Sequence, residues 1–214
     1  MINVCEKCGQ YRNDKIVDKE NSIIICPECG YKRFYKLMPL FMVSGASGSG
    51  KSTICNYLVN KSNKFIVLDM DILWAKHFDQ NENSNAEDFN ETWLRMAKNI
   101  SQAGMPIVLF GAGCIPDYIE ECIEKRYFYK IHYIGLVCSD DILERRLNDR
   151  PTWRNSSNKE FIKNQIGYNN FIKLHKEMHV IETDKLKIKE TSEMIKNWIE
   201  KIIEKGNEKR ANCT

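Results

Sequence analysis

Residues 40–53 read Leu-Phe-Met-Val-Ser-Gly-Ala-Ser-Gly-Ser-Gly-Lys-Ser-Thr, a short apolar run of strand type followed at once by a glycine-rich loop. The loop matches the pattern GxxxxGK[ST] at every position. In such a loop the backbone N–H groups point at phosphate oxygens, the lysine adds a cation for the β- and γ-phosphates, and the next hydroxyl ligates Mg²⁺. The sequence therefore predicts a nucleoside triphosphate site formed by Gly45, Ala46, Ser47, Gly48, Ser49, Gly50, Lys51, Ser52 and Thr53.

Composition limits what surrounds this loop. A chain of 214 residues with 43% hydrophobic content can form one medium α/β domain and a small module. The net charge of +3 creates no field that would by itself imply nucleic acid or an anionic membrane. No apolar run is long enough to span a bilayer and no signal-peptide pattern is present, so we expect a soluble cytoplasmic protein without a membrane partner.

Four of the nine cysteines have metal-ligand spacing. Cys5 and Cys8 form one CxxCG turn, and Cys26 and Cys29 form a second one. Four thiolates complete the tetrahedral shell of a Zn²⁺ ion and leave no open position, so the predicted zinc is structural. A segment this short buries too little apolar surface to fold alone, and metal binding would supply the missing free energy. Four reduced cysteines without a metal are the alternative.

Aromatic and basic residues alternate after the second CxxCG turn. Tyr31, Phe34 and Tyr35 stand among Lys32, Arg33 and Lys36, and such a surface could stack on bases and bind phosphates. An alternating strand that leads into the next domain explains the same pattern. Nucleic acid is therefore a possible partner of the ribbon, but not the favoured one.

Beyond the glycine-rich loop, short apolar runs alternate with longer amphipathic patterns, which is typical of repeated βαβ units. The predicted fold is a three-layer α/β P-loop NTPase domain with a five-stranded parallel sheet at residues 38–206, preceded by a small four-cysteine zinc ribbon at 1–37 and followed by a disordered tail at 207–214. Strands are expected at 40–44, 64–69, 106–110, 131–138 and 178–182, and helices at 51–60, 86–103, 140–148, 158–176 and 187–205. The polar segment 79–90 is a candidate loop or lid.

Two carboxylates stand at the end of the second predicted strand of this domain. If the strand stays extended, the spacing of Asp69 and Asp71 directs both side chains to the same side. The ligand crevice of a parallel α/β sheet lies beyond the carboxyl ends of its strands, which would bring this pair beside the P-loop. One carboxylate could then hold Mg²⁺ and the other accept a proton from an attacking hydroxyl. The alternative is an acidic strand end that merely reaches solvent.

The third predicted strand of the domain ends in Gly111-Ala112-Gly113, where many P-loop ATPases carry a Walker B aspartate. Because no carboxylate stands at this position, we expect Ser52 and Asp69 to bind Mg²⁺. The same absence disfavours a motor or a machine of AAA type. The two glycines either let a substrate approach the backbone or form a tight turn.

Four arginines are concentrated at residues 145–154. Arg146 and Arg150 share a helix face at spacing i, i+4, and Arg154 follows the exit that Pro151 creates. Guanidinium groups bind a transferring phosphoryl group in bidentate fashion, so these three arginines are candidate catalytic residues together with Lys51 and Asp71. Thr183 and Asp184 close the last predicted strand, where a loop could contact the nucleotide base.

These motifs make residues 40–204 similar to the small-molecule and nucleotide kinases of the P-loop class, which include shikimate kinase, gluconate kinase, nucleoside monophosphate kinases and chloramphenicol phosphotransferase. Many bacterial proteins with such stretches are labelled AAA-family ATPases. The resemblance implies that ATP is the donor, that Asp71 is the base or orienting group for a hydroxyl, that Asp69 and Ser52 serve Mg²⁺, and that Thr183 and Asp184 lie near adenine. The ribbon is an addition to the basic family domain, and residues 72–90 match no acceptor signature of the family.

Three functions are compatible with this pattern. The favoured one is an ATP- and Mg²⁺-dependent kinase for a small molecule, with a nucleoside or nucleotide as the expected acceptor. The second is a kinase of nucleic-acid 5′-hydroxyl groups, in which the ribbon would hold the strand. The third is a nucleotide-dependent regulatory protein without small-molecule turnover.

Overall fold

The computed structural model describes residues 1–59, 61–73 and 86–211, and it contains two separate sheets. The first is a three-stranded antiparallel sheet with the order β1 (Ile16–Asp18), β2 (Ile23–Ile25) and β3 (Lys32–Phe34). The second has five parallel strands in the order β5-β6-β4-β7-β8. This arrangement confirms the predicted five-stranded parallel sheet that follows a small N-terminal module.

The strands of the large sheet are β4 (Leu40–Gly45), β5 (Ile66–Asp69), β6 (Ile107–Phe110), β7 (Ile131–Val137) and β8 (Met178–Glu182). All five lie within about two residues of the expected positions. Their order is not the chain order, because β4 is central and β5 is an edge strand that β6 separates from β4.

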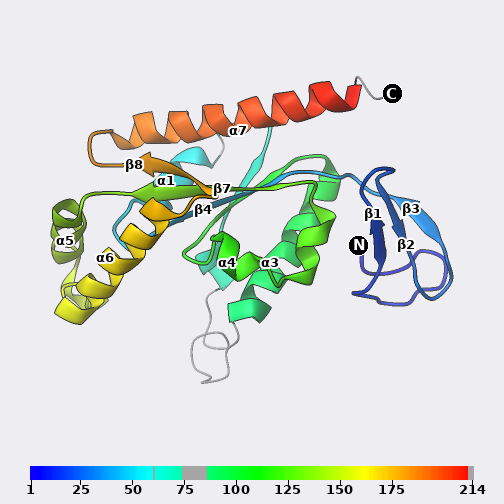
Figure 1. The fold of residues 1–214 in the computed structure, drawn as a ribbon, viewed down its shortest axis with the longest axis horizontal. Coiled ribbons are helices and arrows are strands. Elements are labelled where there is room, and N and C mark those ends of the chain that lie inside the picture. The colour runs from blue at the N-terminus through cyan, green and yellow to red at the C-terminus, as the bar shows by residue number, and fades with distance from the viewer. Residues whose placement is uncertain (60, 74–85, 212–214) are drawn as a thin grey trace.

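Helices cover both faces of this sheet and complete the three layers (Figure 1). On one face, α1 (Lys51–Leu58) and α7 (Ile188–Ala211) pack on the β4 side chains Phe41 and Val43. On the other, α3 (Ala86–Ile100) and α4 (Pro116–Ile119) pack on Leu40 and Met42. The helices α5 (Asp140–Asn148) and α6 (Lys159–Leu174) lie at the end of the molecule farthest from the ribbon. Short 3₁₀ turns complete the connections: η1 (Met70–Leu73), η2 (Ser101–Ala103), η3 (Ile123–Tyr127) and η4 (Thr152–Arg154).

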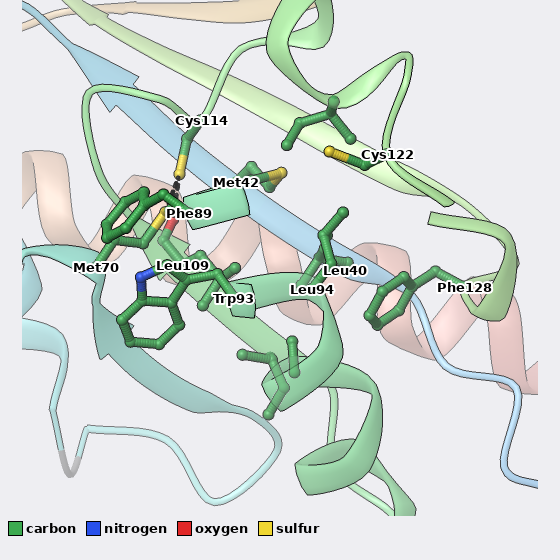
Figure 2. Close-up of a cluster of buried hydrophobic side chains, with 13 residues drawn as sticks. Leu40, Met42, Met70, Phe89, Trp93, Leu94, Leu109, Cys114, Cys122 and Phe128 are labelled. Atoms are coloured by element: carbon green, nitrogen blue, oxygen red, sulfur yellow. Dashed lines mark hydrogen bonds between the residues drawn. The ribbon is translucent and has the colours of Figure 1, made fainter. Parts of the chain in front are cut away.

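The core beneath β4 and β6 is continuous with the end of β5 (Figure 2). Trp93 of α3 is fully buried, and Met70 lies between it and Cys114. The Cys114 Sγ is 3.2 Å from the Met70 Sδ. Because the Met70 side chain is buried in this core, it fixes the position of the chain directly after Asp69.

The helix α6 lies unusually close to strand β7. A Cβ atom placed on Gly135 of β7 would stand only 2.5 Å from the Cγ2 atom of Ile172 on α6. Real Cβ atoms do not approach other heavy atoms this closely, so a residue without a side chain is required here. The absence of a side chain at residue 135 sets the distance between α6 and the sheet.

The antiparallel sheet packs against the amino end of the large sheet. The Ile2 N–H donates to Asn99 Oδ1 of α3 at 2.8 Å, and Tyr35 meets Tyr127 of η3 edge to face. Ile2, Ile24, Tyr35 and Tyr127 form one shared apolar cluster. The N-terminal module and the main domain are thus packed together, although their boundary was predicted between residues 37 and 38.

Two expectations differ from the structure. The helix α7 continues to Ala211, beyond the expected end at 205, because Gly206 costs a helix only about 1 kcal/mol and strong helix formers follow it. The tail expected at 207–214 thus begins within this helix, and residues 212–214 lie outside the described residues. Of the candidate lid at 79–90, residues 86–90 belong to α3, and 79–85 lie outside the described part. Among the described helices, none is long and apolar enough to cross a bilayer.

Candidate active site

The glycine-rich loop connects the central strand β4 to α1 at the carboxyl edge of the sheet. Gly48 and Gly50 have φ values of 95° and 105°, in the left-handed region that residues with side chains rarely adopt. These two turns bring the loop back to the first turn of α1, where the Ser52 hydroxyl is exposed. The geometry is that of a P-loop, with its amide groups at a helix N-terminus.

The ammonium group of Lys51 lies against the loop itself. Its Nζ donates to the carbonyl oxygens of Gly45 at 2.5 Å and Ala46 at 3.0 Å. An ammonium has three hydrogens, so one donor remains for a phosphate oxygen. Burial lowers the pKa of Lys51 to about 8, and the carboxylate of Asp71 acts in the opposite direction. The lysine is therefore poised to gain a bound anion as a partner.

Asp69 and Asp71 lie within electrostatic reach of this lysine, but not as an extended strand would place them. The strand β5 ends at Asp69 and Asp71 belongs to the 3₁₀ turn η1, so the premise of an extended strand was wrong. The physical reason is a local bond, because Asp69 Oδ1 accepts the Asp71 N–H at 3.0 Å and turns the chain. Burial and then the Asp69 carboxylate raise the pKa of Asp71, and Lys51 opposes this.

The segment Gly111-Ala112-Gly113 follows β6, between the carboxylate pair and the P-loop. The Ala112 carbonyl accepts hydrogen bonds from the hydroxyls of Ser44, at 2.9 Å, and Tyr168. A Cβ atom on Gly111 would stand 2.9 Å from Met70 Sδ, and one on Gly113 would stand 3.1 Å from Asn90 Oδ1. Close packing against Met70 thus explains Gly111, whereas a side chain at residue 113 would require only a small shift of Asn90.

Two of the three predicted arginines contact the P-loop. Arg150 Nη1 donates to Ser47 Oγ at 2.9 Å, and Arg146 Nη1 lies 3.3 Å from the Gly48 carbonyl oxygen. Arg154 is exposed in η4 over the ring of Trp153, and its charge helps to lower the pKa of Arg150 after the larger effect of burial. The structure therefore joins Arg146 and Arg150 to the loop and leaves Arg154 at its periphery.

A cavity of about 270 Å³ lies beside the loop, lined by residues 48–50, Thr53, Arg146, Thr183 and Thr191, among others. Thr183 belongs to this wall, and its carbonyl oxygen accepts from Arg146 Nη2 at 3.0 Å. Asp184 contacts the start of α5 instead, where its Oδ2 accepts the Ser139 N–H at 2.8 Å. A carboxylate there stabilises the positive end of a helix dipole.

Sequence reasoning missed two α6 side chains that reach the loop. Gln165 Oε1 accepts the Ser47 N–H at 2.7 Å, and the Tyr168 hydroxyl lies 3.1 Å from Ser44 Oγ. Their signal in the sequence is polarity on an otherwise apolar helix face, since Ile162 and Ile172 of the same helix are buried. This polarity shows that Gln165 and Tyr168 are unusual on that face, but it does not predict which residues they contact.

The four predicted zinc ligands lie together, with all their sulfur atoms within 4.8 Å of one another. The Sγ atoms of Cys5 and Cys29 are 3.6 Å apart, and those of Cys8 and Cys26 are 3.8 Å apart. Zn–S bonds of about 2.3 Å require sulfur separations of about 3.8 Å in a tetrahedron, so the residues fit the ion.

The zinc cluster lies toward the amino end of the central strand β4, because the ribbon precedes this strand in the chain. The P-loop follows β4 and lies at its carboxyl end. Six residues of β4 span roughly 20 Å. A nucleic-acid strand held on the ribbon would have to run along the whole sheet to reach the loop.

Residues 42–166, more than half of the chain, match the protein family described as AAA domain. No curated protein matches the sequence. Among solved structures, the chain is similar to a sugar kinase from Janibacter sp., with 12% identity, a TM-score of 0.57 and coverage of 77% of this chain and 95% of that one.

A tunicamycin resistance protein from Deinococcus radiodurans has 14% identity, a TM-score of 0.58 and coverage of 76% of this chain and 95% of that one. A gluconokinase from Sinorhizobium meliloti 1021 has 14% identity, a TM-score of 0.52 and coverage of 79% of this chain and 98% of that one. At these identities the likeness establishes the fold, which is that of P-loop kinases.

Proposed function

The chain belongs to the AAA domain family, and from this premise we propose that it is an ATP- and Mg²⁺-dependent kinase that phosphorylates a small molecule. One observation carries the proposal: the P-loop with Lys51 follows β4, Asp69 ends β5 and Asp71 lies in the next turn, so all three stand at the carboxyl ends of strands of one sheet. The two carboxylates are near enough to favour the charged form of Lys51. A phosphoryl donor site and a proton acceptor within reach of it are the two parts that phosphoryl transfer requires.

Each side chain of the site has a role in this proposal. The loop amides and Lys51 bind the phosphates, Thr183 lines the cavity that would take the base, and Asp184 supports that wall through α5. Ser52 and one free oxygen of Asp69 would hold Mg²⁺, which neutralises charge on the β- and γ-phosphates when bound. Arg146 and Arg150 would add positive charge beside the P-loop, and Arg154 would add it at the periphery of the site.

Asp71 would accept the proton of the acceptor hydroxyl. The acceptor oxygen forms a bond to the γ-phosphorus, the bond from that phosphorus to the β,γ-bridging oxygen breaks, and ADP leaves. Burial and the Asp69 charge raise the pKa of Asp71, which makes its carboxylate a stronger base than an exposed one.

For the acceptor we propose a nucleoside or nucleotide. The support is the aromatic surface beside Ala112, where the rings of Tyr168 and Phe171 are stacked with an interplanar angle of 14°. Phe171 is 42% exposed and Tyr118, on the neighbouring α4, is 50% exposed. Planar aromatic faces of this kind stack on a base.

An ATP-consumption screen tests the function. The purified chain with Mg²⁺ is offered nucleosides, nucleotides, sugar acids, antibiotics and 5′-hydroxyl oligonucleotides, and we expect a nucleoside or nucleotide to accelerate ADP formation. Asp71→Asn should abolish that acceleration, whereas Glu144→Gln, the same chemical change at an exposed residue of α5, should preserve it.

The outcomes separate the alternatives. Acceleration by oligonucleotides alone, with salt-sensitive binding, would identify a 5′-hydroxyl kinase. Tight ATP binding that no acceptor turns into consumption would identify a regulatory protein. Near-normal turnover by Asp71→Asn would rule out Asp71 as the proton acceptor.

A further inference from the structure

Gln165 of α6 is oriented by the P-loop. Its Oε1 accepts the Ser47 N–H at 2.7 Å. A backbone N–H can only donate, so the oxygen of the side-chain amide must be the atom that faces Ser47. The position of the Nε2 group follows from this, and within the described part of the chain its two hydrogens have no acceptor.

The peptide that Gln165 contacts is also bound by Lys51. The Ala46 carbonyl, which accepts from Lys51 Nζ at 3.0 Å, and the Ser47 N–H, which donates to Gln165, belong to the same peptide unit. The lysine of a P-loop reaches the β- and γ-phosphates. Lys51 and Gln165 thus hold the two opposite edges of one peptide unit, the lysine at its oxygen and the glutamine at its nitrogen.

Two further observations favour the terminal phosphate over the base as the group nearest to Gln165, although Arg150 also lines the cavity that would take the base. Arg150 donates to the Ser47 hydroxyl at 2.9 Å, which adds a second cation next to Gln165. The cavity that would take the base begins at Gly48 and extends toward Thr53 and Thr191. A nucleotide whose base fills that cavity directs its phosphates back along the loop toward Lys51 and Ser47.

We propose that Gln165 recognises the γ-phosphate, with its Nε2 hydrogens donating to a terminal oxygen while Oε1 stays on Ser47. A nucleoside diphosphate has no such oxygen. Gln165 would then distinguish ATP from ADP. The proposal rests on the triphosphate site of the proposed function but not on any acceptor.

Calorimetry with Mg²⁺ and either AMPPNP, a non-hydrolysable ATP analogue, or ADP tests the proposal. Gln165→Leu should weaken AMPPNP binding about tenfold, the usual effect of a lost hydrogen bond to a charged group, and change ADP binding by no more than about twofold. Gln165→Glu keeps an oxygen for Ser47 but replaces the donors with a negative charge. It should weaken AMPPNP binding more than Gln165→Leu does.

Asn164→Ala, at the exposed neighbouring residue of α6, is the matched control and should leave both affinities unchanged. Equal loss of AMPPNP and ADP affinity in the Gln165 variants would overturn the proposal, because it would reduce Gln165 to a support for the loop. Unchanged AMPPNP binding by Gln165→Glu would overturn it as well. Nucleotide discrimination that persists without any acceptor-dependent ATP consumption would sustain the proposal while refuting the kinase activity.

Discussion

Burial against the P-loop is the main cause of the lowered pKa of Lys51. The ammonium has two carbonyl acceptors and two carboxylates within electrostatic reach, but no ion-pair partner in direct contact among the described residues. Burial therefore outweighs the favourable charges, and the pKa falls to about 8. A phosphate bound next to the ammonium would supply the missing negative charge and raise this pKa.

We expect ATP affinity to depend on pH through Lys51. The protonated lysine binds phosphate, so affinity is full below pH 8 and falls as the pH rises above the pKa of about 8. Calorimetry at pH 7 to 9.5 in buffers of different ionisation enthalpy should show proton uptake on binding near pH 8.5. Lys51→Arg, which stays charged, should abolish the uptake, and uptake by this variant would exclude Lys51 as its source.

Asp71 should control the acid side of the activity profile, because its protonated form cannot accept a proton. Asp69→Asn removes the neighbouring charge that raises the pKa of Asp71, but it keeps an oxygen for the Asp71 N–H. The acid limb of kcat should therefore move to lower pH in this variant, even where the maximal rate is reduced. A limb at the wild-type pH would show that a different group is titrating.

Single residues of the site divide into those that local sequence can predict and those that it cannot. The P-loop and the zinc cysteines are contiguous or repeated patterns, and each lies where its pattern predicts. Gln165 is 118 residues from Ser47, so only the packing of α6 brings them together. The turn at Asp71 was missed because one side-chain hydrogen bond overrides the extended geometry.

Helix α5 and the residues directly after it bring Arg146 and Arg150 to the P-loop. Arg150→Ala removes the bond to Ser47 and a cation near the phosphates, so it should weaken ATP binding about tenfold. Arg145→Ala deletes an exposed guanidinium of the same helix and should leave the affinity unchanged. Similar losses in both variants would mean that net charge, rather than the contact with Ser47, sets the affinity.

The sequence predicts where helices and strands begin and end much better than it predicts which strands lie next to one another. The strand β8 and the helix α5 have the expected bounds, since the spacing of apolar residues marks them locally. The order β5-β6-β4-β7-β8 depends on which strand pairs with which, and periodicity within a strand carries no such information. The separation of Asp69 from the P-loop by a whole strand was therefore not predictable.

Ribbon and main domain share one apolar cluster, so the molecule should unfold as a unit. Removal of zinc by a chelator should lower the melting temperature of the whole chain by several degrees, because the loss of the ribbon exposes Tyr127 and the α3 surface. Differential scanning calorimetry checks this. Zn²⁺ but not Mg²⁺ should restore the original transition, whereas an unchanged main transition would show that the two parts fold independently.

A buried ion pair lies next to that shared cluster. Glu124 and Lys98 are 2% and 1% exposed, and the Lys98 ammonium stands 3.8 Å above the ring of Tyr127. Glu124→Gln would leave a buried ammonium without its counter-charge and should destabilise the chain by about 3–5 kcal/mol in urea unfolding. Glu120→Gln, at an exposed residue of the neighbouring segment, is the matched control, and equal stability of the two variants would contradict the expectation.

Gly135 determines how closely α6 packs on β7. The one missing methyl group lets α6 rest directly on β7, and α6 carries both Gln165 and Tyr168 to the P-loop. Alanine at residue 135 would push α6 away from β7 and withdraw both side chains from the P-loop together, although no residue of the loop is itself replaced. The activity would then depend on the spacing between α6 and β7, which is set at a residue outside the site.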